Sequence, residues 1–88
     1  MTPEKIQHIL DTLHNSEDHT SWDFDKSSGD PWNGYTRNGY EITYYPETNT
    51  YTWRNTFDNG FTNIEYDDAF EISEVDLIAR LEKLNYTI

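Results

Sequence analysis

Apolar residues near the start of the chain recur with the spacing of an amphipathic helix. Those that share one helical face are Ile6, Ile9, Leu10 and Leu13. Thr2 is a residue type that caps helix N-termini, and Pro3 suits the first helical position. The pattern predicts a helix over residues 3–14.

A second helical pattern lies near the other end of the sequence. Its apolar stripe consists of Leu77, Ile78, Leu81 and Leu84. Ser73 followed by Asp76 forms a capping box with Asp in place of the usual Glu, and Ile72 can contact Leu77 as a hydrophobic staple. These features predict a helix over residues 74–85.

The stretch between the helices has the composition of β-strands. Residues 40–45 and 50–57 are rich in Tyr, Thr and Trp, which favour strands. Residues 46–49 have turn composition, and Asn59-Gly60 is typical of a two-residue hairpin leading into residues 61–66. Three antiparallel strands are therefore predicted.

The two turns also predict which residues pair across the strands. With Tyr45 opposite Thr50, the first turn predicts two pairs: Glu41 with Arg54, and Ile42 with Trp53. With Asp58 opposite Phe61, the second turn predicts two more: Arg54 with Glu65, and Trp53 with Tyr66. Each turn thus places an acid beside Arg54, a pairing that stabilises a sheet.

These pairings give the predicted sheet one apolar and one polar face. The apolar face carries Tyr40, Ile42, Tyr44, Tyr51, Trp53, Ile64 and Tyr66. The polar face carries Glu41, Thr43, Thr50, Thr52, Arg54, Asn63 and Glu65. Because only the apolar face needs cover, we expect both helices on that side. The expected fold is α+β, a three- to four-stranded antiparallel meander over residues 35–66, in which Asn38-Gly39 forms a further hairpin after a strand at 35–37.

Residues 16–34 show no regular hydrophobic period. They contain many turn-forming residues, yet Trp22, Phe24 and Trp32 are too apolar to be left bare. Because a long loop without structure of its own is uncommon, we expect a short strand near residues 22–25 and then a loop held by aromatic side chains.

The chain has 88 residues, a formal net charge of −11 and no cysteine. The length allows one domain, residues 1–88. The absence of cysteine excludes disulfides, Cys-ligated zinc and thiol nucleophiles. The sequence contains no apolar run that could cross a membrane and no recognisable signal peptide. Nucleic acids and anionic membranes are not expected as direct partners, because phosphate binding needs a basic surface.

No metal, cofactor or catalytic site is expected. Asp23, Asp25 and Ser27 resemble the start of a calcium loop, but the required glycine and final glutamate are replaced by Ser28 and Gly34. His8 and Asp11 are three residues apart on the predicted helix, but a structural zinc site needs four ligands in a tetrahedron. The sequence has no hydrolase or nucleotide-binding motif, and so short a chain leaves little room for a substrate cleft between paired carboxylates.

The acidic residues are segregated from the basic ones. Seven acids and no base lie between Arg54 and Arg80, and five acids and no base lie between Lys5 and Lys26. A solvated acidic face is one interpretation; the other is a surface that binds the cationic groove of a nucleic-acid-binding protein. The candidate partner-binding residues are Asp23, Asp25, Glu65, Asp67, Asp68, Glu71, Glu74 and Asp76.

In length, negative charge and predicted helix–sheet–helix order, the whole chain resembles the small acidic phage-encoded inhibitors that mimic DNA, the anti-CRISPR proteins in particular. No signature residues are shared. The resemblance implies a non-enzymatic inhibitor that occupies the DNA-binding groove of a nuclease or CRISPR effector in the cytoplasm of a bacterial host cell. Immunity proteins that neutralise nuclease toxins are similarly small and acidic, and this alternative stays open.

A different alternative is an accessory domain that binds another protein through aromatic side chains, since interfaces favour Trp and Tyr. The loop residues Trp22 and Trp32 are its main candidates, with Tyr35 and Tyr45 beside them. Packing beneath the loop is the competing interpretation of both tryptophans.

Overall fold

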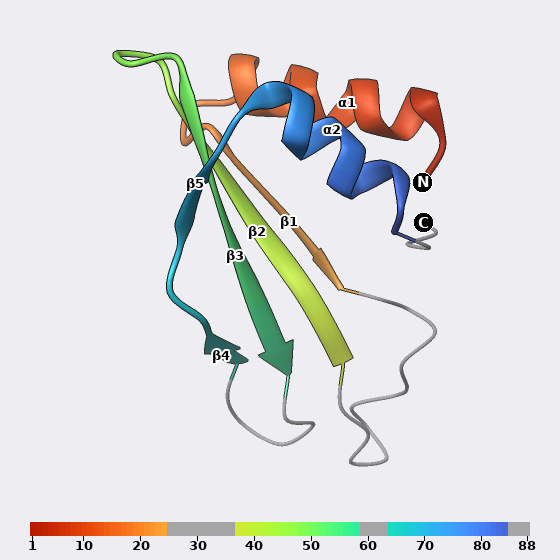
Figure 1. Ribbon diagram of the computed structural model, residues 1–88. Coiled ribbons are helices and arrows are strands. Elements are labelled where there is room, and N and C mark those ends of the chain that lie inside the picture. The colour runs from red at the N-terminus through yellow and green to blue at the C-terminus, as the bar shows by residue number, and fades with distance from the viewer. Residues whose placement is uncertain (25–36, 59–63, 85–88) are drawn as a thin grey trace.

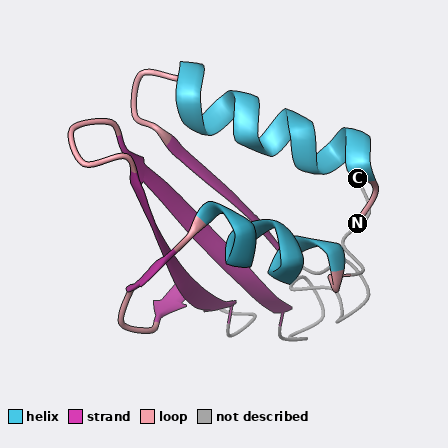
Figure 2. Cartoon of the chain, turned by 45° about the horizontal axis from the view of Figure 1, so that its top comes forward, coloured by secondary structure: helices cyan, strands magenta, loops and turns pink. Residues whose placement is uncertain are grey.

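The computed structural model describes residues 1–24, 37–58 and 64–84. The elements follow the order α1 (Pro3–Asn15), β1 (Thr20–Phe24), β2 (Arg37–Tyr45), β3 (Thr50–Asp58), β4 (Ile64–Tyr66), β5 (Phe70–Ile72) and α2 (Glu74–Glu82). Both helices lie on the same face of an antiparallel sheet (Figures 1 and 2). The α+β fold with two helices on one face is therefore confirmed.

Both helices begin with the predicted caps. The Thr2 hydroxyl accepts a hydrogen bond from the Lys5 amide at 3.3 Å, and the Ser73 hydroxyl accepts one from the Asp76 amide at 3.2 Å. Helix α1 ends one residue beyond its predicted end. Helix α2 ends at Glu82 with Lys83 as its C-cap, short of residue 85, which is outside the described residues.

The strands form one sheet in the order β1-β2-β3-β4, and β5 also pairs with β3. Between β2 and β3 the predicted register is confirmed, with Tyr45 opposite Thr50 and Glu41 opposite Arg54. Strand β1 pairs along β2 and confirms the short strand predicted near residues 22–25, although it begins two residues earlier, at Thr20; Asp25 lies outside the described residues.

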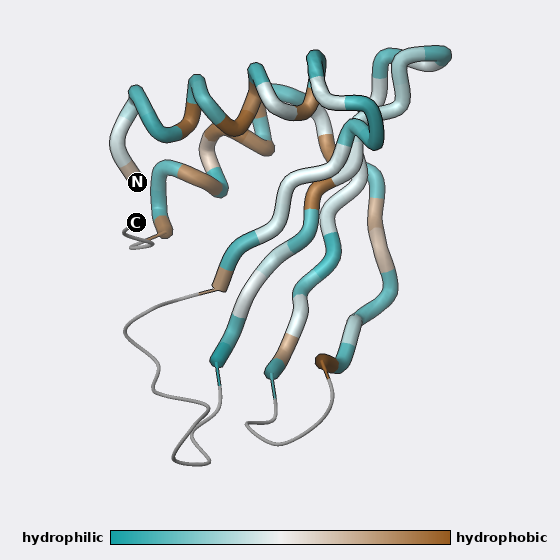
Figure 3. Tube along the Cα trace, turned by 180° about the vertical axis from the view of Figure 1, so that it is seen from behind, coloured by the Kyte–Doolittle hydropathy of each residue, from teal (hydrophilic) through white to brown (hydrophobic). Residues whose placement is uncertain are grey.

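The hydrophobic core lies between the helices and the sheet. Its buried members are Ile6, Ile9, Leu13, Tyr40, Ile42, Tyr51, Trp53, Ile72, Leu77 and Leu81. The rings of Tyr40 and Trp53 stack with centroids 5.0 Å apart at its centre. Figure 3 shows hydrophobic segments recurring among hydrophilic ones along both helices, as the periodicity predicted.

The hairpin predicted at Asn38-Gly39 is wrong. Both residues lie inside β2, where Asn38 pairs with Phe57 and Gly39 with Thr56. The partner strand β3 is long enough to keep β2 extended through this point, so pairing overrides the local turn preference. Of the strand predicted at 35–37, Arg37 begins β2 and the other two residues lie outside the described part of the chain.

The predicted register of the last strand is also wrong. Asp58 pairs with Ile64, so five residues separate the paired positions and not two; the Asn59-Gly60 turn itself falls outside the described residues. Glu65 lies opposite Phe57 and Tyr66 opposite Thr56. Because side chains alternate between faces along a strand, Ile64 and Tyr66 lie on the face away from the helices, and Glu65 lies on the helix side.

Strands β4 and β5 follow one another along β3 with one extra residue between them. Tyr66 pairs with Thr56 and Phe70 pairs with Trp53, so four steps on the edge strand match three steps on β3. This is the geometry of a β-bulge. It reverses the alternation, so Phe70 and Ile72 face the helices although Ile64 and Tyr66 do not.

Candidate protein-binding surface

Six exposed carboxylates follow one edge of the molecule from β4 through β5 into the first turn of α2. We call them the acidic edge: Glu65, Asp67, Asp68, Glu71, Glu74 and Asp76. The structure thus places six of the eight predicted binding residues along one continuous segment.

The local fold explains why these side chains reach solvent. Asp67 and Asp68 lie in the bulge, where the Asp67 amide still donates to the Asn55 carbonyl at 2.9 Å. Glu71 lies opposite Thr52 on the face away from the helices. Glu74 and Asp76 occupy the first turn of α2, where carboxylates complement the positive end of the helix dipole.

No described cation forms an ion pair with the acidic edge. Where both partners lie in the described part of the chain, ion pairs join Arg37 to Asp58 at 2.8 Å and Arg54 to Glu41 at 2.7 Å, both between β2 and β3. Arg80 in α2 lies instead over the rings of Trp53 and Phe70, at 5.2 and 5.1 Å. The described arginines therefore do not neutralise the six carboxylates by ion pairing.

One carboxylate of the edge also belongs to a hydrogen-bond network. The Tyr51 hydroxyl donates to Glu74 Oε1 at 3.0 Å, and His14 Nε2 lies 2.7 Å from the same hydroxyl oxygen. Since the phenol has a single proton, His14 must be the donor in the second contact. Burial raises the pKa of Tyr51 above its usual value of 10.0, and the hydrogen bond and charge of Glu74 raise it further.

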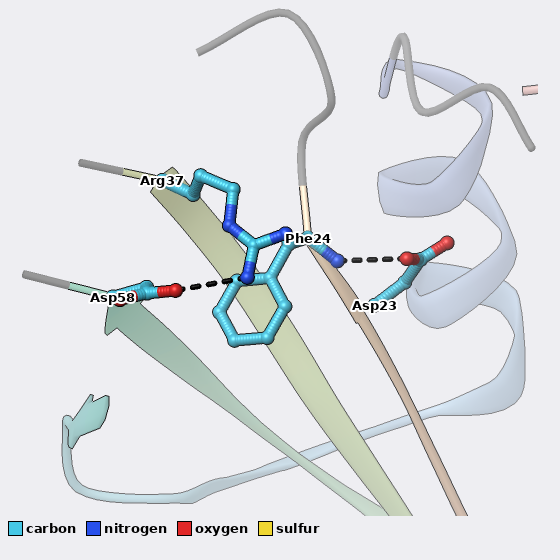
Figure 4. A network of polar contacts seen from close by, with 4 residues as sticks. All are labelled: Asp23, Phe24, Arg37 and Asp58. Atoms are coloured by element: carbon cyan, nitrogen blue, oxygen red, sulfur yellow. Dashed lines mark hydrogen bonds and ion pairs between the residues drawn. The ribbon is translucent and has the colours of Figure 1, made fainter. Parts of the chain in front are cut away.

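The second predicted patch is not joined to this edge. Asp23 lies in β1, which is at the opposite end of the strand order from β4. It is half-buried, shares the helix side of the sheet with its partner Tyr40, and its Oδ1 accepts a hydrogen bond from the Phe24 amide at 2.8 Å (Figure 4). Asp25 is outside the described residues. Asp23 is thus separated from the acidic edge by the width of the sheet.

The face of the sheet opposite to the helices, here called the outer face, carries a groove of about 270 Å³. It is lined by Trp22, Phe24, Glu41, Thr56, Ile64 and Tyr66. Trp22 is 64 % exposed and meets Phe24 edge-on, with ring centroids 5.9 Å apart. The groove is therefore bounded by aromatic side chains from β1 and by Ile64 and Tyr66 from β4.

Two arginines already lie on aromatic rings of the outer face. The Arg37 guanidinium lies 4.6 Å from the centroid of Phe24 while it pairs with Asp58 (Figure 4). The Arg54 guanidinium lies 4.2 Å from the centroid of Tyr66 while it pairs with Glu41. Each guanidinium is thus held by a ring and a carboxylate together.

Sequence reasoning found Trp22 as a candidate contact but missed Ile64 and Tyr66 beside it, because their predicted register put them in the core. Tyr45 is exposed on the outer face, as expected. Trp32 and Tyr35 are outside the described residues.

Among the described residues, no group of three or more His, Cys, Asp or Glu side chains is placed to hold a metal ion. The His14 ring is hydrogen-bonded to the Tyr51 hydroxyl, and His19 Nδ1 lies 2.8 Å from the Leu13 carbonyl oxygen. Neither described helix has the length and hydropathy needed to span a membrane. The chain matches no protein-family model, no curated protein and no solved structure.

Proposed function

We propose that this protein is a non-enzymatic inhibitor that binds a basic nucleic-acid-binding protein, a nuclease or CRISPR effector, by imitating DNA phosphates with its acidic edge. The observation that supports this proposal is the edge itself. Six exposed carboxylates follow one segment, and none forms an ion pair with a described residue.

The spacing of the carboxylates suits this role. Residues along a strand rise about 3.3 Å each. The carboxylates from Glu65 to Glu71 therefore follow one another along the edge at intervals of several ångströms. Duplex DNA carries one phosphate charge per about 1.7 Å of its axis. Glu65 and Glu71 point to opposite faces of the sheet, so a groove lined with Lys and Arg would meet negative charges on both sides of the edge that it encloses. The net charge of −11 would accelerate the encounter.

The first test is charge reversal at the bulge. The protein serves as bait for partners from the native host, and duplex DNA is then used as the competitor for the captured complex. We expect D67K/D68K to weaken the complex at least about tenfold, because opposed charges at an interface contribute this much or more. Raising the salt concentration should weaken the unmodified complex as well.

The matched control is D11K/E17K, which changes the net charge by the same amount at exposed positions in and just after α1. It should weaken binding much less, because neither residue belongs to the acidic edge. Equal losses in the two variants would show that only overall charge matters. Affinity unaffected by salt and by D67K/D68K would rule out phosphate mimicry.

A further inference from the structure

The groove on the outer face contains one aromatic side chain that no described cation covers. Arg37 lies over Phe24 and Arg54 over Tyr66, whereas Trp22 has no such contact with a described Arg or Lys. Trp22 is nevertheless the most exposed of the three rings, and an indole ring attracts cations more strongly than the rings of Phe or Tyr.

A carboxylate lies directly across from this ring. Trp22 and Glu41 are paired residues of β1 and β2, so their side chains emerge next to each other on the outer face. Glu41 uses Oε1 to pair with Arg54. A carboxylate has about four acceptor positions, so this pairing leaves Glu41 able to accept from a second guanidinium.

We propose that the groove beside Trp22 receives an arginine side chain of the basic partner. This inference rests on the proposed function, because it names the residue type with which that partner enters the groove. The guanidinium stacks on Trp22 and donates to Glu41, and the aliphatic part of the side chain packs toward Ile64. The guest repeats the arrangement that Arg37 and Arg54 already adopt on this face.

Two features favour arginine over other guests. A planar guanidinium stacks on a ring and hydrogen-bonds in its own plane at the same time, which the ammonium group of lysine cannot do. An uncharged apolar guest would fill the groove but would leave the acceptor positions of Glu41 unused. The whole surface is also strongly negative, which favours a cationic guest.

The groove and the acidic edge share strand β4, from which Ile64 and Tyr66 point to the outer face and Glu65 points to the helix side. Strand β4 contributes Ile64 and Tyr66 to the groove, and its middle residue Glu65 belongs to the edge. Asp67 follows directly. A partner that covers the acidic edge therefore lies beside β4, the strand that borders the groove.

The test uses two peptides of equal charge, nona-arginine and nona-lysine, titrated into the intact protein by calorimetry. We expect nona-arginine to bind about 3–10-fold more tightly, the range that cation–π contacts support at partly exposed sites. The indole N–H signal of Trp22 should shift in NMR spectra with nona-arginine and much less with nona-lysine.

Because arginine also pairs well with carboxylates at the acidic edge, two variants at Trp22 locate the preference. Trp22→Leu keeps an apolar side chain but removes the ring, and should reduce the arginine preference to about twofold or less. Trp22→Phe keeps a ring and should retain part of the preference. Both substitutions are at an exposed position and should leave the fold intact, which circular dichroism would confirm.

An unchanged arginine preference in Trp22→Leu would overturn the inference. The proposed function fails in a different way: D67K/D68K should weaken both peptides by a similar factor if the acidic edge binds them. If that double variant weakens neither, the edge is not the binding surface. If it weakens both and Trp22→Leu changes nothing, the edge binds cations and the groove has no role.

Discussion

Gly39 shows how one missing side chain shapes the outer face. A Cβ atom at this position would lie 2.5 Å from the Asp23 carbonyl oxygen and 2.6 Å from both Phe24 Cδ1 and Thr56 Oγ1. The space above Gly39 is thus filled by its neighbours, with the Phe24 ring over the position where a side chain would begin. The requirement for glycine is steric, and it allows Phe24 to be buried against the sheet.

Gly39→Ala should therefore destabilise the protein by about 1–3 kcal/mol, the usual cost of forcing extra atoms into a packed site. The backbone carbonyl of Asp23 cannot move away as a flexible side chain could. Urea unfolding followed by circular dichroism would measure the change. Thr43→Ala, on the same strand and face, is the control and should cost less. A Gly39→Ala variant as stable as the wild type would mean that β1 can shift away from β2.

The same residue explains one error of sequence reasoning. Asn-Gly is a strong hairpin signal when nothing else opposes it. Here Phe24 covers the glycine and β3 supplies partners on the other side, so the strand continues through Asn38 and Gly39. Neither neighbour can be recognised from the dipeptide alone.

At the scale of elements, the predictions that succeeded depended on local chemistry. The caps at Thr2 and Ser73 and the short turn between Tyr45 and Thr50 each depend on residues a few positions apart. The register predicted for β4 was wrong because it depends on where pairing resumes after Asp58 and on a bulge near Asp67. The observed register of β4 differs from the predicted one by three residues, and any odd shift moves a strand's side chains to the other face.

The candidate site also has one part that local sequence could predict and one part that depends on strand register. Charge segregation identified the carboxylates of the acidic edge, because exposure of acids in a strand edge and a helix start does not depend on register. The groove could not be predicted, because Tyr66 joins Trp22 on one face only through the observed register. A bulge signal was present in the paired acids Asp67-Asp68, which interrupt the apolar alternation between Tyr66 and Phe70.

The network of His14, Tyr51 and Glu74 joins three elements and predicts a pH effect. Burial of Tyr51, aided by Glu74, raises its pKa in the folded protein above the value of 10.0 expected when unfolded. Above pH 10 the unfolded chain loses this proton while the folded protein keeps it, so stability falls as pH rises. This contribution is fully present below pH 10.

The free energy of unfolding measured from pH 9 to pH 11.5 should therefore decline more steeply for the wild type than for Tyr51→Phe. Glu74→Gln keeps Tyr51 buried but removes the carboxylate, and its decline should be intermediate because burial is the larger cause. Parallel profiles for the wild type and Tyr51→Phe would show that the hydroxyl titrates equally in both states.

Across the whole molecule, the arrangement of charge has opposite effects on stability and on binding. The described arginines pair with carboxylates on the outer face or lie over a core ring, and they form no ion pair with the acidic edge. Six neighbouring carboxylates repel one another in the free protein, which destabilises the folded state. Their charged positions in a bulged edge also prevent further strands from pairing there. A partner groove would relieve the repulsion that the cations among the described residues leave in place.

Neutralising part of the edge should separate these two effects. D67N/D68N keeps the shape of both side chains and should raise the melting temperature by about 1–5 °C, since exposed charge interactions of a few tenths of a kcal/mol shift small domains this much. Added salt should stabilise the wild type more than this variant. Nona-lysine should bind the variant more weakly, because two of its attractive charges are gone.

The control D11N/E17Q removes the same number of charges away from the edge. It should weaken nona-lysine binding less than D67N/D68N does, because the peptide is attracted most strongly where carboxylates are closest together. If D67N/D68N lowered the melting temperature, these two carboxylates would be stabilising the bulge in the free protein. Their exposure would then serve the fold, and the case for a binding role would weaken accordingly.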